Sequence, residues 1–538
     1  MLHRITHPRI PMARISIYDS TLRDGAQTQG ISYSVEDKIK IVERLDALGV
    51  GYIEAGNPGS NPKDLEFFAR ASTLKLANAR IIAFGATRKA GLRVADDGNV
   101  LSLLKANTSA IAIFGKSWDY QVLEILRTTL DENLCMIGDT VRYLKQQRKE
   151  VVFDAEHFFD GYKDNPEYAM KTLAAAVDAG ADSICLCDTN GGSFPDEIFG
   201  ITREVCQRFS VTVGIHCHND SEMAVANSIR AVQAGATQVQ GTINGLGERC
   251  GNANLCSIIP NLQLKLGHEC IPAEAMRHLT SVARSVSEIA NMPQNEKAAY
   301  VGGHAFAHKG GMHIDAVVKN PISYEHINPD LVGNSRRVLM SEVAGRSTLL
   351  ARINVVDPTL TKDSPETRRI IDRLKELEHA GYQFEAAESS FDLVVRKMLG
   401  RYTPFFELVE FKVITNEPAV NDVNSSVIIK VRVGDQEVLT VAEGDGPVNA
   451  LDKAARKALE RLYPAIGEIR LTDYKVRVLD SDLASAAKVR VLIESSDGSE
   501  NWTTIGVSSD IINASWQALV DSIEYKLLRD QERTQQAA

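Results

Sequence analysis

Between Arg14 and about Leu266 the sequence alternates eight short apolar runs with amphipathic stretches such as Val35–Leu48, and this alternation restricts the fold more than any other feature. Each apolar run has the length of a buried strand, and each amphipathic stretch has the period of a helix. The runs are Ile15–Tyr18, Gly51–Ala55, Ile81–Phe84, Ala110–Phe114, Val151–Asp154, Ser183–Cys187, Val211–His216 and Thr237–Thr242. Eight such units in about 250 residues predict an α/β fold, a closed (β/α)8 TIM barrel. An open doubly wound sheet is the alternative, but the first turn lacks the GxGxxG of dinucleotide-binding sheets.

The pattern changes twice after the predicted barrel. From about Ile271 to Leu399 it is helical and irregular, and after Leu399 it is rich in strand-like segments. There, Val441–Tyr463 aligns with Ile505–Leu527 at a constant offset of 64 residues, and each copy combines strands with one amphipathic helix. This predicts an α+β domain with an internal pseudo-two-fold repeat. We therefore expect a barrel over 14–280, helical linker subdomains over 281–389 and a C-terminal domain over 390–538.

The composition excludes several classes of partner. The 538 residues carry a net charge of −10, which argues against nucleic acid or an anionic membrane as the main partner. The eight cysteines form no CxxC pair, so we interpret them as reduced thiols. No apolar run approaches the roughly 18 residues of a membrane span, and the first residues contain no apolar signal segment. We expect a cytoplasmic protein.

Two histidines end the seventh strand-like run, in Gly214-Ile-His-Cys-His-Asn-Asp220. Because side chains alternate along a strand, His216 and His218 point to one face and Cys217 points to the other. Two imidazoles on one face at the carboxyl end of a barrel strand indicate a metal site. The alternative is two polar residues that only hydrogen-bond to their neighbours.

The first strand-like run leads into an adjacent arginine and aspartate, Arg23 and Asp24. The simple interpretation is an ion pair near the start of the next helix. The functional interpretation assigns Asp24 to a metal and Arg23 to an anionic substrate, because a guanidinium matches a carboxylate with two parallel hydrogen bonds.

A polar, glycine-rich segment, Asn244–Asn254, follows the eighth run. The simple interpretation of this segment is a flexible turn. Its glycines also allow the backbone to approach a ligand closely, and the amide oxygen of Asn252 is a candidate metal ligand. Oxygen and imidazole donors together suit Mg²⁺, Mn²⁺ or Zn²⁺.

Taken together, these segments resemble the family of 2-isopropylmalate, homocitrate and citramalate synthases. The matching stretches are Tyr18–Gly25 with Gln27, His216–Asp220 followed by Ala224–Ser228, and Gly245–Asn252. The resemblance implies the (β/α)8 fold and an aldol-type condensation of a cosubstrate, acetyl-CoA, with a 2-oxo acid. It also implies one divalent metal ion whose ligands are Asp24, His216, His218 and Asn252.

The same resemblance implies the catalytic side chains. Glu156, after the fifth run, matches the family's active-site glutamate, although a helix-initiating carboxylate would explain it equally well without the resemblance. Arg23 would offset charge on the developing alkoxide, and Thr189 would hold the carboxylate of the acceptor. His313 and Tyr324 match the family's helical subdomain, whose side chains usually reach the barrel of a neighbouring subunit.

Two stretches, Leu186–Gly192 and Glu54–Gly59, look most like the long citramalate synthases of this family. That subgroup implies pyruvate as acceptor and citramalate as product, on the route to isoleucine. The 2-isopropylmalate and homocitrate synthases are alternatives, since Asp220-Ser-Glu222 departs from the Asp-x-Gly of many members. A hydroxyacyl-CoA lyase and a catalytically silent metal-binding regulator are alternatives of other classes.

The C-terminal region resembles the family's allosteric amino-acid-binding domain. The resemblance implies a homodimer under feedback control, with isoleucine as the expected inhibitor and leucine as the runner-up. The turns Gly444–Pro447 and Ser508–Asp510 precede the helices of the two copies. We expect backbone N–H groups at such a helix start to hold the carboxylate of the effector.

Two further expectations concern the lining of the site. Phe84, Thr87 and Phe114, at the ends of the third and fourth runs, are candidates for the acceptor pocket, where wide aromatic rings favour a short acceptor. We interpret Cys185, Cys187 and Cys217 as buried packing residues and not as thiolates.

Overall fold

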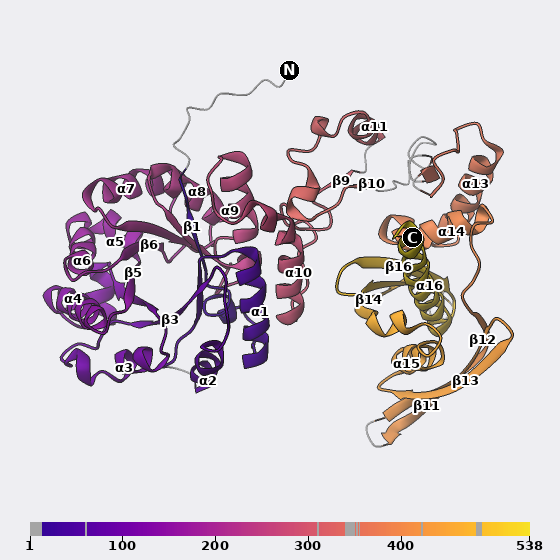
Figure 1. The fold of residues 1–538 in the computed structure, drawn as a ribbon, viewed down its shortest axis with the longest axis horizontal. Coiled ribbons are helices and arrows are strands. Elements are labelled where there is room, and N and C mark those ends of the chain that lie inside the picture. The colour runs from indigo at the N-terminus through magenta and orange to yellow at the C-terminus, as the bar shows by residue number, and fades with distance from the viewer. Residues whose placement is uncertain are drawn as a thin grey trace. The chain divides into compact units, whose positions relative to one another are not determined.

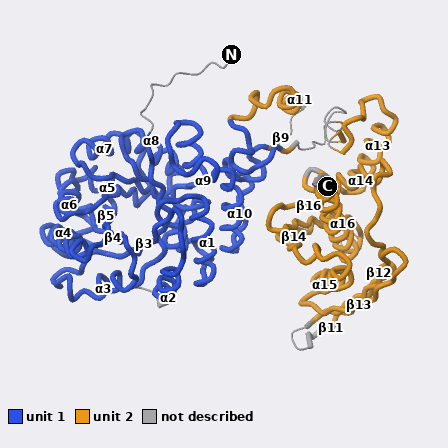
Figure 2. The backbone as a smooth tube through the Cα atoms, in the orientation of Figure 1, with its two compact units in different colours: residues 1–306, 327–336 blue, residues 307–326, 337–538 orange. Residues whose placement is uncertain are grey.

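The computed structural model describes residues 13–59, 62–308, 311–338, 350, 353–354, 356–420, 423–479 and 487–537. The chain forms two compact units, residues 1–306 with 327–336 and residues 307–326 with 337–538 (Figure 2). No helix in these described ranges is long and apolar enough to cross a membrane.

The first unit contains the predicted closed barrel, in which eight parallel strands pair in chain order and β8 pairs with β1 (Figure 1). The strands are β1 (Ser16–Asp19), β2 (Tyr52–Gly56), β3 (Arg80–Ala86), β4 (Ala110–Lys116), β5 (Glu150–Glu156), β6 (Ser183–Asp188), β7 (Thr212–Cys217) and β8 (Gln238–Gly241). The prediction of a TIM barrel is therefore confirmed. The open-sheet alternative is wrong, because β1 and β8 share four paired residues and leave no open edge.

Helices cover the outside of the barrel. They are α1 (Val35–Leu48), α2 (Pro62–Ala71), α3 (Gly98–Lys105), α4 (Leu130–Gln146), α5 (Phe158–Asp164), α6 (Pro166–Asp178), α7 (Pro195–Arg208), α8 (Ala224–Ala234), α9 (Leu255–Pro260) and α10 (Leu279–Ile289). The first of them shows how the sequence fixes the ends of a helix. Ser34 and Asp37 form a reciprocal capping box at its start, and Gly49 ends it with φ 90°.

The second unit begins with short elements and continues into an α+β region. The strands β9 (Ala307–His308) and β10 (Arg337–Val338) pair in parallel, and α11 (Gly311–Lys319) lies between them in sequence. Then come α13 (Pro365–His379) and α14 (Glu388–Met398). Two antiparallel sheets follow, each with a helix after it. They consist of β11 (Glu407–Val420), β12 (Val423–Val433), β13 (Gln436–Gly444) and α15 (Pro447–Leu459), then β14 (Arg470–Val478), β15 (Val489–Ser496), β16 (Asn501–Ser508) and α16 (Ile511–Ala537).

The two sheets share their register at the offset of 64 residues. Ile429 pairs with Thr440 in the first sheet, and Ile493 pairs with Thr504 in the second. Each threonine hydroxyl donates to a carbonyl of the following helix, at 2.9 Å and 2.8 Å. The pseudo-two-fold relation of the two halves and the boundaries at 280 and 390 stay predictions.

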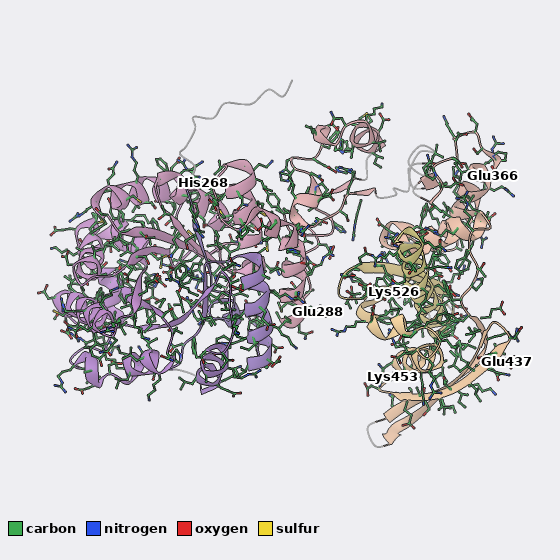
Figure 3. The ribbon with its side chains drawn as sticks, viewed as in Figure 1. His268, Glu288, Glu366, Glu437, Lys453 and Lys526 are labelled. Atoms are coloured by element: carbon green, nitrogen blue, oxygen red, sulfur yellow. The ribbon has the colours of Figure 1, made fainter. Side chains whose placement is uncertain are left out.

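A buried charge cluster joins α16 to the loop between β15 and β16. Lys526 of α16 (Figure 3) contacts Asp497 and Asp530, each at 2.9 Å. The side chains of Lys526 and Asp497 are only 6% and 5% exposed. This paired cluster fixes the loop against the helix.

Candidate active site

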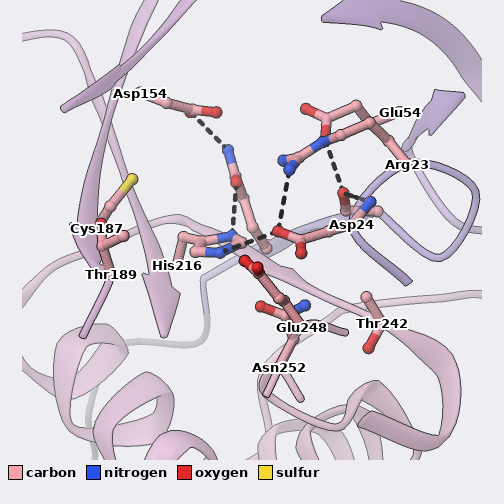
Figure 4. A network of polar contacts seen from close by, with 12 residues as sticks. Arg23, Asp24, Glu54, Asp154, Cys187, Thr189, His216, Thr242, Glu248 and Asn252 are labelled. Atoms are coloured by element: carbon pink, nitrogen blue, oxygen red, sulfur yellow. Dashed lines mark hydrogen bonds and ion pairs between the residues drawn. The ribbon is translucent and has the colours of Figure 1, made fainter. Parts of the chain in front are cut away.

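A cavity of about 610 Å³ opens at the carboxyl ends of the barrel strands. The barrel residues proposed from the sequence that line it are Arg23, Asp24, Glu156, Thr189, His216 and His218. They come from four different strands or strand ends, and closure of the barrel brings them together. Figure 4 labels four of them, Arg23, Asp24, Thr189 and His216. This is the end of a TIM barrel at which enzymes of this fold place their catalytic groups.

Asp24, His216 and His218 form a compact group of metal-binding side chains. One donor atom from each lies within 4.8 Å of the others, and all three residues are buried. His216 Nε2 is 3.6 Å from Asp24 Oδ2, and the two imidazole rings are 5.2 Å apart. The alternation expected along the strand therefore places both rings on the cavity side.

Asn252 is brought to this group by its own loop. Its backbone forms an antiparallel bridge with His218, and its Nδ2 donates to the carbonyl of Leu246 at 3.1 Å. Gly247 leaves room for this side chain, because a Cβ at that position would meet Asn252 Nδ2 at 2.2 Å. The glycines of the segment therefore serve a close approach of the chain to itself.

The donor atoms fit a divalent cation. Asp24 Oδ1, Asn252 Oδ1 and His218 Nδ1 are buried and have no hydrogen-bond partner among the described residues. Buried polar atoms of folded proteins are normally paired, so three such atoms in one place call for a ligand. Carboxylate, amide oxygen and imidazole nitrogen together form a set that Mg²⁺, Mn²⁺ and Zn²⁺ accept.

The electrostatics of the group favour its metal-binding forms at neutral pH. Burial raises the pKa of Asp24, but the charge of Arg23 and the nearby histidines outweigh it and lower the pKa to about 2. Burial, together with the neighbouring His216, lowers the pKa of His218 to about 4. An ionised carboxylate and a neutral imidazole are the protonation states that bind metal ions.

Arg23 is held by a carboxylate that sequence reasoning did not assign. Its Nε donates to Glu54 Oε1 at 2.5 Å, and its Nη1 donates to Asp24 Oδ2 at 3.1 Å. Glu54 also accepts hydrogen bonds from Tyr18 and Ser20 and is completely buried. The signal in the sequence was a charged residue inside the apolar run Gly51–Ala55, where a carboxylate needs a specific partner.

Glu156 and Thr189 stand at the ends of β5 and β6. Glu156 forms an ion pair with Lys116 at 2.6 Å, and Lys116 is a second residue that sequence reasoning did not assign. The Thr189 hydroxyl oxygen accepts a hydrogen bond from the backbone N–H of His157 at 2.8 Å. That contact leaves the hydroxyl proton of Thr189 available to a ligand in the cavity.

His313 and Tyr324 belong to the second unit, on α11 and just after the short helix Pro321–Ser323. Their rings stack with centroids 4.1 Å apart. Both side chains are exposed, with 49% of Tyr324 open to solvent. The structure therefore brings these two residues to each other within their own unit.

The cysteines of the barrel strands are buried thiols. Burial raises the pKa of Cys185 and of Cys217 well above the usual value of a thiol. Both side chains therefore stay protonated at neutral pH, as expected for packing residues.

Comparison with known protein families covers nearly the whole chain. Residues 14–286 match the HMGL-like family, residues 300–381 match the homocitrate synthase post-HMGL domain-like family, and residues 385–527 match the LeuA allosteric (dimerisation) domain. The first match coincides with the barrel and its active-site residues.

Individual relatives point the same way. The (R)-citramalate synthase of Aquifex aeolicus is 53% identical over 521 residues, which are 96% of this chain and 99% of that protein. The (R)-citramalate synthase of Geobacter sulfurreducens is 52% identical over 97% of this chain and 99% of its own. The 2-isopropylmalate synthase of Methanocaldococcus jannaschii is 32% identical over 97% of this chain and 96% of its own.

Among solved structures, the hydroxymethylglutaryl-CoA lyase from Pseudomonas aeruginosa has a TM-score of 0.44 at 18% identity, over 53% of this chain and 95% of that one. The full-length relatives decide the family. The chain belongs to the family of acyl-transferring synthases that contains the 2-isopropylmalate and (R)-citramalate synthases.

Proposed function

We propose that this chain is an (R)-citramalate synthase, which condenses acetyl-CoA with pyruvate and releases CoA. The observation that carries the proposal is the identity of 44–53% over almost the full length to five (R)-citramalate synthases. The identity to a 2-isopropylmalate synthase of similar coverage is 32%. Acetyl-CoA, pyruvate and water give citramalate and CoA, so one carbon–carbon bond forms and one thioester is hydrolysed.

Asp24, His216, His218 and Asn252 would hold the divalent metal ion. When bound, such an ion polarises the keto group of the acceptor and makes its carbon electrophilic. Arg23 forms an ion pair with Asp24, one of these four residues, and would offset the negative charge that develops on the acceptor oxygen. Its orientation is fixed by Glu54, so little reorganisation is needed during the reaction.

The remaining cavity residues would handle the two substrates. The Thr189 hydroxyl would donate to the carboxylate of pyruvate, because its own oxygen already accepts from His157. Glu156 would take a proton from the methyl group of acetyl-CoA, which is a weak carbon acid. Lys116, whose ammonium group lies 2.6 Å from Glu156, would hold this carboxylate in position for the proton transfer.

The aromatic side chains of the cavity favour a short 2-oxo acid as the acceptor. Phe84 and Phe114 both line the cavity, and their rings stack 5.3 Å apart. Phe84 also faces the guanidinium group of Arg23. The two aromatic rings would leave less room for a branched acceptor than for the small methyl group of pyruvate.

We assign His313 and Tyr324 to the completion of the site from outside the barrel, as the family resemblance implies. Their exposure leaves both rings available to a substrate or to a second subunit. The match of residues 385–527 to the LeuA dimerisation domain supports a homodimer with regulation. Mn²⁺, Mg²⁺ and Zn²⁺ remain the candidate metals.

We propose isoleucine as the feedback inhibitor, bound at the N-terminus of α15. The starts of α15 and α16 differ, because the Asp510 carboxylate already accepts from the backbone of Ile512 at the start of α16. At α15 the N-cap is Gly446, and the space beside its Cα is open, because a Cβ there would meet no described atom within 4 Å. The unpaired N–H groups of a first helical turn attract a carboxylate.

The test of the proposed function is the release of free CoA thiol from acetyl-CoA with a panel of 2-oxo acids. Pyruvate is expected to exceed 2-oxoisovalerate and 2-oxoglutarate in kcat/KM. If 2-oxoisovalerate is best, the chain is a 2-isopropylmalate synthase. If no acceptor releases thiol and a hydroxyacyl-CoA is cleaved instead, the chain is a lyase.

A further inference from the structure

Gln240 connects one of the two site histidines to a carboxyl group elsewhere in the barrel interior. His216 on β7 and Gln240 on β8 pair directly across neighbouring strands, and His216 Nδ1 lies 3.1 Å from Gln240 Oε1. Gln240 Nε2 donates to Asp154 Oδ1, on β5, at 2.9 Å, the contact drawn as a dashed line at Asp154 in Figure 4. All three residues are buried, so water does not compete for these contacts.

This chain of contacts has a direction. A carboxylate oxygen can only accept, so the amide of Gln240 must turn its NH₂ group toward Asp154. Its oxygen then faces His216, and Nδ1 of that ring must carry the proton and donate it. The lone pair is left on Nε2, the atom that lies 3.6 Å from Asp24 Oδ2.

The direction is strict for an ionised Asp154. Burial, with the nearby charge of Glu54, raises the pKa of Asp154 to about 7. A neutral carboxyl group can accept through its carbonyl oxygen or donate its own proton to a turned amide, and the structure has the accepting arrangement, with Gln240 Nε2 donating to Asp154 Oδ1. By contrast, His218 Nδ1 has no hydrogen-bond partner among the described side chains and backbone groups.

We propose that Gln240, oriented by Asp154, is a positioning residue that holds His216 in the Nδ1–H form with Nε2 turned to the metal site. The inference rests on the metal site of the proposed function and adds Gln240 and Asp154 as residues that support one of its ligands. Partners of this kind fix the tautomer and ring orientation of a metal-binding histidine, and their loss typically weakens metal affinity about 10- to 100-fold.

The experiment measures Mn²⁺ binding to the full-length chain by calorimetry after treatment with a chelator, so it does not depend on turnover. Gln240→Met has a side chain of similar length and removes both hydrogen bonds. We expect it to weaken Mn²⁺ binding about 10- to 100-fold. Gln240→Glu keeps an acceptor for His216 Nδ1–H, and we expect it to retain most of the affinity that Gln240→Met loses.

A matched control lies on the same strand. Gln238 is also buried on β8, two residues away and therefore on the same face, and its Oε1 has no hydrogen-bond partner among the described residues. Gln238→Met makes the same chemical change without touching His216. We expect it to bind Mn²⁺ as tightly as the unaltered chain.

Asp154→Asn tests the direction of the contacts. An asparagine can donate to Gln240 Oε1, which frees the amide to turn its NH₂ group toward His216 and favours the other tautomer. We expect weaker Mn²⁺ binding and, in ¹⁵N-histidine spectra of the metal-free chain, a shift of one neutral ring from the Nδ1–H to the Nε2–H form.

Unchanged Mn²⁺ affinity in both Gln240→Met and Asp154→Asn would overturn the positioning role while leaving the metal site in place. Absence of Mn²⁺ binding by the unaltered chain would instead overturn the metal site itself. If Gln240→Met loses the circular dichroism of a folded chain, the Mn²⁺ affinity and the ¹⁵N spectra of Asp154→Asn decide whether the positioning role holds.

Discussion

The guanidinium carbon of Arg23 lies 3.8 Å from the centroid of the Phe84 ring. The same arginine donates to Glu54, so the ring and the carboxylate together hold its guanidinium group at the cavity. In the proposed function, Phe84 therefore both narrows the acceptor pocket and supports the arginine that would offset charge on the acceptor.

Phe84→Ala is expected to widen the acceptor pocket and to weaken the support of Arg23. Loss of that support lowers kcat/KM for every acceptor, whereas the ratio between two acceptors reports the size of the pocket. We expect the preference for pyruvate over 2-oxoisovalerate to fall by roughly 10- to 200-fold, the usual value of a methylene or branch in a tight pocket. Phe84→Tyr, which keeps the ring, should preserve the preference. An unchanged ratio in Phe84→Ala would exclude Phe84 from acceptor selection.

His216→Ala and His218→Ala are each expected to abolish Mn²⁺ binding and turnover. Both rings face the cavity, so their removal leaves the barrel core packed and the fold intact. Cys217→Ala is the control, because Cys217 lies between them on the strand and points away from the site. Calorimetry, circular dichroism and thiol release check the three expectations. Full activity of a chelated, metal-free sample would refute metal dependence.

His313→Ala is expected to lower kcat far more than it raises KM for pyruvate. We assign His313 to enolisation or to the attack of water, and such a role is exercised only in the transition state. Met312→Ala is the control, because Met312 is adjacent and 82% exposed. Steady-state kinetics with pyruvate separate the two parameters. A change in KM alone would contradict the assignment.

Gly446→Asp is expected to abolish inhibition by isoleucine. A carboxylate at the N-cap of α15 competes with the carboxylate of the effector and is compatible with the helix. Gly446→Asn is nearly isosteric and uncharged, so it should raise the half-inhibiting concentration of isoleucine much less. The unaltered chain, the two variants and leucine as second effector are compared in the thiol assay. Insensitivity of the unaltered chain to both amino acids would remove the basis of the proposal.

Deletion of the residues beyond Ser390 would disturb folding as well as regulation. Ser390 lies within α14, and its hydroxyl donates to Asp521 of α16 at 2.7 Å. The neighbouring Phe391 packs in one core cluster with Ile505 of β16. A cut there would expose a packed surface, so point variants are preferable.

Asp497→Asn is expected to destabilise the second unit by about 2 kcal/mol at neutral pH, a usual value for hydrogen bonds to a charged group. Burial raises the pKa of Asp497, but hydrogen bonds from Glu500, Ser499 and Lys526 outweigh it and hold the pKa below the usual value. A carboxylate with a depressed pKa contributes stability above its unfolded pKa of about 3.9, and this contribution is lost as the pH falls below about 4.

Urea unfolding followed by tryptophan fluorescence measures this contribution, since Trp502 and Trp516 are buried in the second unit. Asp473→Asn is the control, because its ion pair with Lys475 is exposed and worth about 0–1 kcal/mol. The difference between Asp497→Asn and the unaltered chain should shrink as the pH is lowered toward 3. A difference that stays constant with pH would assign the effect to packing and not to charge.

The amino-acid sequence alone was enough to predict the barrel, because the alternation of apolar runs and amphipathic helices is a local property of the chain. It also determined that His216 and His218 share a face, since the alternation of side chains along a strand needs no tertiary information. Asp24 and Asn252 were candidate ligands by residue type, and only the resemblance to a family favoured the metal over the simpler interpretations of their segments. The roles of Thr189 and Glu156 rested on the resemblance too, because they are single residues without a local pattern.

The contacts that support these groups appear only in the folded chain. Glu54 meets Arg23 across 31 residues of sequence, and Gln240 meets Asp154 across 86. Both contacts are non-local, because the pairing of β1 with β2 brings Glu54 near Arg23, and the closed barrel places Gln240 of β8 and Asp154 of β5 in one interior. Burial then makes these contacts strong, since a buried amide or carboxylate without a partner is costly.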